Sequence, residues 1–322
     1  MSVRGAVVLA ALLGGCAAAP PPAAPVVTGE PLGREECPPL RVTKSVNDDE
    51  TLRTVDARAS LALYEQLVIQ DPSDPELLWQ LALAYESQER WDAAATTFAR
   101  AAVLAPEQAR YWYRSGRAWL RQGAAGDEEA WETAREPLEK CIELRPSDAR
   151  CQFLLGEAEE FSDREQQAAE HYEQALLRDP TKPRYYLRLA ELYASFRRHP
   201  EAEKVLVEGV KLVPASTEND PERCVLFVRL AHAARLRRDE AAELAALASA
   251  ELLADAASPQ MLYELGVSYA ALDAPGKGAD ARNQKAVTLL SRFVKRVCRG
   301  AHALDFRDQC ERSNQLLQRL GP

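Results

Sequence analysis

The chain has 322 residues, of which 47% are hydrophobic and 28% are charged, and its formal net charge at pH 7 is −9. This apolar content indicates a folded chain, and scarce glycine together with long segments of helical period favours an all-α fold. The acidic balance, with charges of both signs interspersed, argues against a protein that binds along nucleic-acid phosphates.

The N-terminal segment has the pattern of an export signal. Arg4 is followed by the apolar run Ala6–Leu13, which is too short for a membrane span of about 20 residues. A basic start, a short apolar run and small residues are typical of a signal peptide. No later segment of the sequence is long and apolar enough to span a membrane.

The apolar run leads into Leu13-Gly14-Gly15-Cys16, which resembles the bacterial lipoprotein signal. In that class, an apolar residue and two small residues precede a cysteine that becomes the acylated first residue of the mature chain. The resemblance implies a signal peptide over residues 1–15 and lipidation of Cys16. Ala17 follows where an aspartate would indicate inner-membrane retention in enteric bacteria, which implies the outer membrane, facing the periplasm. The alternative is an ordinary signal peptide cut nearby, with Cys16 incidental.

Residues 16–45 are rich in alanine, proline and valine and show no helical or strand period. Proline-rich linkers are semi-rigid and extended, at roughly 3.1 Å per residue. We therefore expect a lipidated tether that holds the folded part tens of ångströms from the membrane.

Residues 46–293 contain an internal repeat whose period is shown by regularly spaced prolines. Five prolines are spaced 34, 40, 34 and 34 residues apart: Pro72, Pro106, Pro146, Pro180 and Pro214. Because proline cannot lie in a helix interior, each is expected between two helices. The six extra residues of the longer interval fall in the turn Gly123–Ala130. Aligned on the prolines, the units share a column with a small second residue, as in Leu81-Ala82 and Leu155-Gly156.

The pattern resembles the tetratricopeptide repeat, a 34-residue helix–turn–helix unit. The clearest unit has the family's residues at Leu78, Leu81, Ala82, Tyr85, Ala94, Phe98, Ala101 and Pro106. The resemblance implies a right-handed superhelical solenoid of about six to seven units over residues 46–293. The first unit, with its helix around Val46–Ala57, and the last two are degenerate. Residues 294–322 would form C-terminal capping helices. The alternative, an unrelated helical bundle, does not predict a 34-residue period.

In this family the first helix of each unit lines a concave groove. One groove position carries large apolar residues in successive units: Trp79, Tyr113, Phe153, Leu187, Val228 and Tyr263. Arg110, Arg117 and Arg121 fall on the same face of one unit. An exposed stripe of this kind would suit a protein partner. The alternative is that these side chains only fill gaps between neighbouring first helices.

The groove lacks the Lys and Asn residues with which co-chaperone members of the family clamp a C-terminal carboxylate. The corresponding positions carry Tyr113, Arg117, Phe153 and Glu157. A partner helix or an extended apolar peptide is therefore the better expectation.

Cysteine spacing suggests two possible disulfides, which an oxidising compartment would permit. Cys141 and Cys151 lie five residues either side of Pro146, and Cys298 and Cys310 are similarly placed around a turn. Each pair is expected either as a disulfide or as two buried thiols. No CxxC pair and no Cys/His zinc spacing occurs, so no metal site is predicted.

Enzyme motifs are missing from the sequence. There is no HExxH, GxSxG or GxGxxG, and the loop Ala271–Gly278 lacks the leading glycine and the final Ser/Thr of a phosphate-binding loop. The sequence therefore predicts no catalytic residues and no cofactor. An unrecognised active site in residues 255–322 remains a competing hypothesis.

The favoured interpretation is a non-catalytic scaffold, anchored in the bacterial envelope by acylated Cys16, that recruits or helps assemble an envelope complex. Its partners would be envelope proteins, with the membrane contacted through the lipid anchor alone and no nucleic acid bound. Pilotin-type lipoproteins and scaffolds of peptidoglycan enzymes resemble it. The alternative is a periplasmic ligand-binding solenoid for peptide or glycan fragments.

Overall fold

The computed structural model describes residues 41–43, 52–54, 57–217, 220–254, 258–271, 279–299 and 304–321. All of them belong to the second of two units into which the chain divides, Leu40–Pro322. Cys16, the signal-peptide pattern and most of the expected tether lie outside the described residues, as does most of the loop Ala271–Gly278.

Two short strands precede the helices. β1 (Arg41–Thr43) pairs with β2 (Leu52–Thr54) in antiparallel register, with Arg41 opposite Thr54 and Thr43 opposite Leu52. This pair differs from the expectation of an aperiodic tether followed by a degenerate helix. Three residues are too few for an alternating pattern to be recognised in a sequence. Each strand is stabilised by pairing with the other rather than by the β propensity of its own residues.

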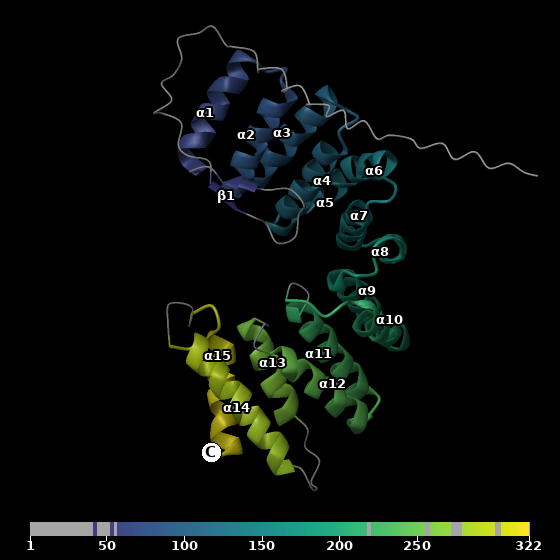
Figure 1. The fold of residues 1–322 in the computed structure, drawn as a ribbon, viewed down its shortest axis with the longest axis vertical. Helices are drawn as coiled ribbons and strands as arrows, with labels where there is room; N and C mark the ends of the chain where they lie inside the picture. Colours follow the sequence, from purple (N-terminus) through teal and green to yellow (C-terminus); the bar gives the residue numbers. More distant parts are fainter. Residues whose placement is uncertain are drawn as a thin grey trace, which may run out of the picture. The chain divides into compact units, whose positions relative to one another are not determined.

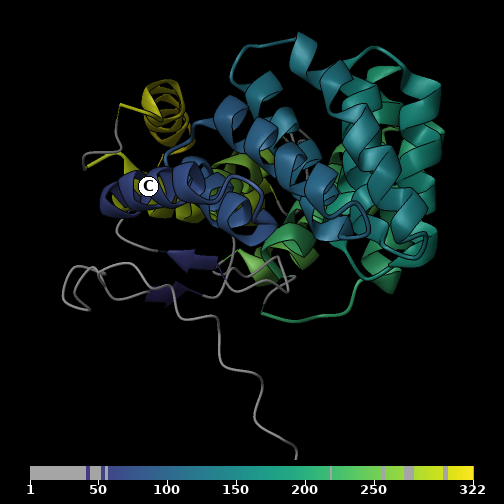
Figure 2. The same ribbon diagram turned by 90° about the horizontal axis from the view of Figure 1, so that it is seen from above.

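From Ala57 onward the described chain is helical, and each helix packs against the next (Figure 1; Figure 2). The helices are α1 (Ala57–Gln70), α2 (Pro75–Ser87), α3 (Trp91–Leu104), α4 (Ala109–Ala124), α5 (Glu129–Thr133), α6 (Arg135–Leu144), α7 (Ala149–Phe161), α8 (Glu165–Arg178), α9 (Pro183–Ser195), α10 (His199–Leu212), α11 (Asp220–Leu236), α12 (Glu240–Leu253), α13 (Pro259–Ala270), α14 (Ala279–Val297) and α15 (Arg307–Leu320). The all-α architecture predicted from the repeat is confirmed.

The helices form hairpin units, each with a first and a second helix. The first helices are α2, α4, α7, α9, α11 and α13, and the second helices that follow them are α3, α5–α6, α8, α10, α12 and α14. Local chemistry sets the starts: Pro75 opens α2, and the side chain of Asp74 accepts from the backbone N–H of Glu76 at 2.8 Å.

The two helices of a unit approach closely where the first carries a small residue. A Cβ atom added at Gly156 would lie 2.7 Å from the ring of Tyr172, and one at Gly116 would lie 2.5 Å from Leu138. Both large side chains are fully buried. The small second residue of the shared column therefore leaves the space that a large side chain of the second helix fills.

The buried core follows the units along the chain as three clusters, around Phe98, Tyr186 and Phe293. Neighbouring clusters share partly buried side chains: Trp119 contacts the first and second, and Leu230 contacts the second and third. Each unit thus completes its core on its neighbours, as expected for stacked repeats.

The cysteines of both spaced pairs are joined in the structure. Cys141 at the end of α6 is bonded to Cys151 in α7, with their Cα atoms 6.0 Å apart, and Cys298 is bonded to Cys310 at the start of α15, with a Cα separation of 5.7 Å. Cys224 is a free, buried thiol, and burial raises its pKa to about 11. The second bond ties α15 to the end of α14.

Candidate protein-interaction surfaces

The large apolar residues expected to form an exposed stripe are mostly buried. Trp79 is 6% exposed and Phe153 is 3% exposed, and Leu187 and Val228 are also buried. These four residues fit the packing alternative, in which they fill the space between neighbouring helices. Tyr113 and Tyr263 are only half-buried. We therefore correct the expectation of a continuous exposed apolar stripe.

Residues of the following unit cover two buried members of the row, Trp79 and Phe153. The ring of Phe153 stacks on Tyr185 of α9 with centroids 4.7 Å apart, and Trp79 packs against Tyr111 of α4 at 5.3 Å. Tyr263 also lies against a ring, Phe293 of α14, at 5.4 Å. These rings are thus covered both by the second helix of their own unit and, for Trp79 and Phe153, by the following unit.

Three of the aromatic residues are also covered by an arginine of the next unit. The guanidinium of Arg110 lies 5.1 Å from the ring centroid of Trp79, that of Arg150 lies 5.2 Å from Tyr113, and that of Arg184 lies 5.0 Å from Phe153. Arg150 follows Arg110 by 40 residues and Arg184 follows Arg150 by 34, as the prolines do. The contact therefore recurs at one repeat position, and each cation–π pair contributes on the order of 0.5–1 kcal/mol at such exposure.

Each of these arginines also meets a carboxylate. Arg110 pairs with Glu76 at 2.7 Å, Arg150 with Asp148 at 2.9 Å, and Arg184 with Glu157 at 3.0 Å. Their side chains remain between a third and a half exposed. The row therefore offers oriented cations at regular intervals along the first helices.

The arginines predicted on α4 have different environments. Arg117 pairs with Glu86 of α2 at 2.5 Å, whereas Arg121 is exposed and has no ion-pair partner within the described residues. Glu86 also accepts from Arg114, which is only 1% exposed, at 3.1 Å. The buried Arg114 could not be predicted, because the sequence of an arginine-rich helix does not reveal which guanidinium the neighbouring helix covers.

The charge row continues through α9, α11 and α13. Arg188 pairs with Glu160 at 2.8 Å and with Glu191 at 3.4 Å, and Arg229 pairs with Glu264 at 3.2 Å. Burial raises the pKa of Glu160, against the hydrogen bond that Tyr172 donates to it at 2.6 Å and the charge of Arg188. The pairs Arg188–Glu160 and Arg229–Glu264 join the first helices of successive units, whereas Arg188–Glu191 lies within α9.

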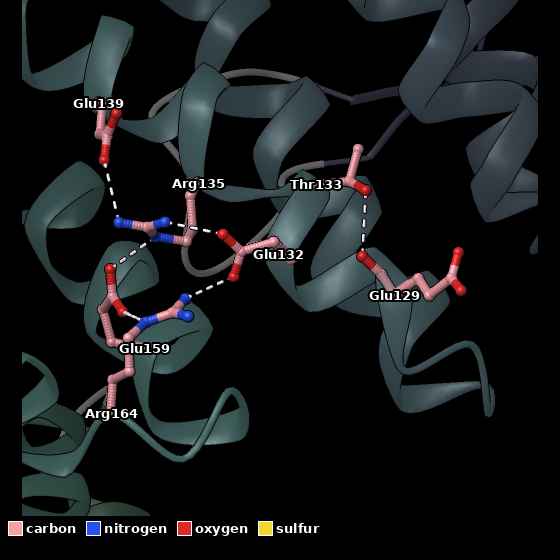
Figure 3. A network of polar contacts seen from close by, with 7 residues as sticks. All are labelled: Glu129, Glu132, Thr133, Arg135, Glu139, Glu159 and Arg164. Carbon is pink, nitrogen blue, oxygen red and sulfur yellow. Dashed lines mark hydrogen bonds and ion pairs between the residues drawn. The ribbon is translucent and has the colours of Figure 1, made fainter.

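A closed polar network holds the inserted α5 against α7 (Figure 3). The buried carboxylate of Glu159 accepts from Arg135 at 2.8 Å and from Arg164, and Glu132 accepts from the same two arginines at 2.8 and 2.7 Å. These hydrogen bonds from Arg135 and Arg164 lower the pKa of Glu132. Each carboxylate binds two guanidinium groups, so these four side chains hold the helices together.

A second surface lies on α3, α4 and α6, which surround a pocket of about 580 Å³. Trp112 and Trp119 of α4, Val103 and Leu104 of α3, and Pro137 of α6 form much of its wall. Sequence reasoning did not identify this site, because its walls come from helices of two units that no local sequence pattern brings together.

The described residues offer no evident metal or membrane site. In the part of the chain that the structure covers, no three His, Cys, Asp or Glu side chains are grouped as a metal site would require. The described helices include none with the length and apolar content to cross a membrane.

Burial lowers the pKa of His171, whose Nδ1 lies 2.8 Å from the side-chain oxygen of Gln152.

Comparisons with known proteins concern the fold. Sequence models described as tetratricopeptide repeats match residues 52–109, 82–136 and 162–218. The C-terminal part of a TPR repeat-containing protein from Cytophaga hutchinsonii is 13% identical with a TM-score of 0.56, covering 73% of this chain and 90% of that chain. The APC/C hetero-tetramer Cut9-Hcn1 is 14% identical with a TM-score of 0.50, covering 80% of this chain and 46% of that chain.

A third similar structure is residues 41 to the end of MamA from Desulfovibrio magneticus RS-1. It is 23% identical with a TM-score of 0.44, covering 48% of this chain and 85% of that chain. No curated protein matches the chain.

Proposed function

Because the chain is an all-α solenoid of tetratricopeptide repeats, we propose that it is a non-catalytic scaffold whose first helices bind another protein. The observation that carries this proposal is the recurring arginine-over-aromatic contact at three successive interfaces between first helices. Recurrence at one repeat position gives a surface with regular polar contacts, on which a partner segment can lie across several units.

The exposed groups define the kind of partner. Half-exposed cations and the half-buried Tyr113 and Tyr263 are available for contact, whereas most of the large apolar residues are not. A helix or extended peptide that combines acidic and apolar side chains fits this surface better than a purely apolar peptide. Tyrosine and arginine are also the residue types that commonly dominate binding energy at interfaces.

We place this scaffold in the bacterial envelope. The support is the sequence Leu13-Gly14-Gly15-Cys16, with acylation of Cys16 as the anchor and residues 16–45 as the tether. Disulfides at Cys141–Cys151 and Cys298–Cys310 suit an oxidising compartment outside the cytosol. We further propose that the anchor lies in the outer membrane, facing the periplasm, and that the scaffold assists a secretin pore or peptidoglycan enzymes.

Photo-crosslinking in cells tests the binding surface. A benzophenone amino acid replaces Tyr113 or Tyr263, and a control carries it at Leu177, a 76% exposed residue of α8. We expect one envelope protein to be captured from positions 113 and 263 and not from 177. Arg184→Glu should weaken this capture, with Lys211→Glu on α10 as the charge-matched control. Equal capture from 177, or none from either tyrosine position, would count against the proposal.

A further inference from the structure

The pocket on α3, α4 and α6 lies where the second helix of its unit is interrupted. The interruption is the single residue Ala134, between Thr133 of α5 and Arg135 of α6, and its backbone N–H still bonds to the carbonyl of Ala130 at 3.0 Å. Thr133, Glu136 and Pro137 line the pocket at this interruption, facing Val103 and Leu104 at the end of α3. The pocket thus lies between α3 of one unit and the helices α4 and α6 of the next.

The interior of the pocket presents apolar surface. Its hydroxyl groups are already bonded to backbone carbonyls: Thr96 to Asp92 at 2.9 Å, Ser115 to Ala95 at 3.0 Å and Thr133 to Glu129 at 3.0 Å. The indole N–H of Trp112 donates to the carbonyl of Pro106 at 2.9 Å, and its half-buried ring packs against the core around Phe98 while it lines the pocket. A volume of about 580 Å³ lies within the range of natural ligand sites.

This site is separate from the proposed groove. On α4 the groove side carries Arg110, Tyr113, Arg117 and Arg121, and the pocket side carries Trp112, Ser115 and Trp119. At 3.6 residues per turn these two sets lie about half a turn apart around the helix. One helix therefore presents two faces, and a ligand on one does not occupy the other.

The rim of the pocket carries one charge of each sign. Arg100 of α3 and Glu136 of α6 are exposed, and neither lies within ion-pair distance of an opposite charge among the described residues. Val103, which is 71% exposed, and Leu104, which is 45% exposed, extend the apolar surface beyond the pocket. A membrane surface would favour a uniformly basic rim, whereas a rim with both signs suits a peptide that carries both.

We infer that this pocket binds an amphipathic helix of a protein partner. The helix inserts large apolar side chains between Trp112 and Trp119 and places an acidic residue against Arg100 and a basic residue against Glu136. The two tryptophans are seven residues apart on α4, about 10.5 Å along its axis at 1.5 Å per residue. Apolar residues two turns apart on a second helix lying alongside have the same spacing, which is the helix-in-groove mode of recognition.

The probe is a pair of fluorescein-labelled helical peptides of about 18 residues, added to the full chain. Both carry leucines two turns apart, and they differ only in the order of one glutamate and one lysine that flank the leucines. Fluorescence anisotropy should show saturable binding, with one order preferred by about tenfold. The double substitution Arg100→Glu and Glu136→Arg should reverse this preference, because both rim charges then change sign.

A matched pair of variants tests the location. Val103→Asp should weaken binding of the preferred peptide by about tenfold or more. Leu177→Asp is the control, because Leu177 holds the same repeat position on α8 and is 76% exposed. It should leave binding unchanged, and circular dichroism shows whether both variants keep their helices.

Three outcomes would overturn the inference. The first is that neither peptide binds saturably up to about 1 mM. The second is that wild type and the charge-exchanged variant both bind the two peptides equally. The third is that Leu177→Asp weakens peptide binding as much as Val103→Asp does. Binding of the apolar dye ANS that Val103→Asp abolishes and neither peptide displaces would show a small apolar ligand instead. Crosslinking from Tyr113 is independent of all these results, so this inference and the proposed function can fail separately.

Discussion

At the residue scale, the turn between the first and second helix contains a left-handed residue in the five units whose turn the structure describes. Glu89, Asp163, Arg197 and Arg238 have φ angles of 57°, 58°, 59° and 60°, each between the first and second helix of its unit. In the unit with the longer turn, Gly126 has a φ of 113°. A side chain with a Cβ costs on the order of 1 kcal/mol in this region, and glycine avoids that cost. Four units therefore keep a strained residue where glycine would fit.

Arg197→Gly should stabilise the protein. The Arg197 side chain is exposed, so its removal loses little, and the relief of strain exceeds the added chain entropy by about 0.5 kcal/mol. Urea unfolding measures the gain as a higher midpoint with an unchanged slope. Arg197→Ala keeps the Cβ and is the control; an equal rise in both variants would contradict the strain explanation.

His171 should make stability depend on pH near neutrality. Burial lowers its folded-state pKa, so the unfolded chain binds the proton more readily. Its contribution is therefore present above the unfolded pKa of about 6.5 and is lost as pH falls through the folded value. Between pH 7.5 and 5.5 the free energy of unfolding of wild type should fall more than that of His171→Gln. Parallel pH profiles for the two proteins would contradict this expectation.

At the element scale, the last helix depends on a covalent link. α15 packs on α13 and α14, yet within it only Cys310 and Ser313 are buried. The disulfide Cys298–Cys310 closes an interval of 12 residues and contributes about 2–3 kcal/mol in the chain-entropy account. This constraint offsets the small apolar area by which α15 holds to the last unit.

Replacing Cys298 and Cys310 by serine should release α15 while the earlier units stay folded. Each repeat contacts mainly its neighbours, so the loss stays local. Hydrogen exchange should lose protection in α15 and adjoining parts of α14 and keep it in α2–α4. The corresponding pair of substitutions at Cys141 and Cys151 should instead affect α6 and α7. A uniform loss of protection in both variants would contradict a modular stack.

At the scale of the whole molecule, anchoring should depend on one residue. If Cys16 carries the lipid, Cys16→Ser moves the protein from the membrane fraction to the soluble fraction, because no described helix can replace the anchor. Membrane fractionation with immunoblotting measures this, and Cys224→Ser, at a buried thiol, is the control. Retention of the serine variant in the membrane would refute the anchor.

The order of the helices could be predicted from the sequence because their boundaries are local. Pro75, Pro183 and Pro259 open helices in the structure, and the prolines of the repeat fall between them. Because a proline lacks the backbone N–H that a helix interior requires, the positions of the prolines indicate helix ends without knowledge of tertiary contacts. The small residues of the shared column likewise indicated where two helices approach.

Only the tertiary structure decided which side chains of the first helices remain accessible. Trp79 and Phe153 hold the same repeat position as Tyr113, yet they are buried. Rings of their own unit and of the following unit pack against both, as Phe98 and Tyr111 do against Trp79. The pocket beside Trp112 likewise joins residues of α3, α4 and α6, which only the packing of two units brings together. Helix periodicity is visible in residues three or four positions apart, whereas exposure depends on contacts between residues 19 to 32 positions apart in the sequence.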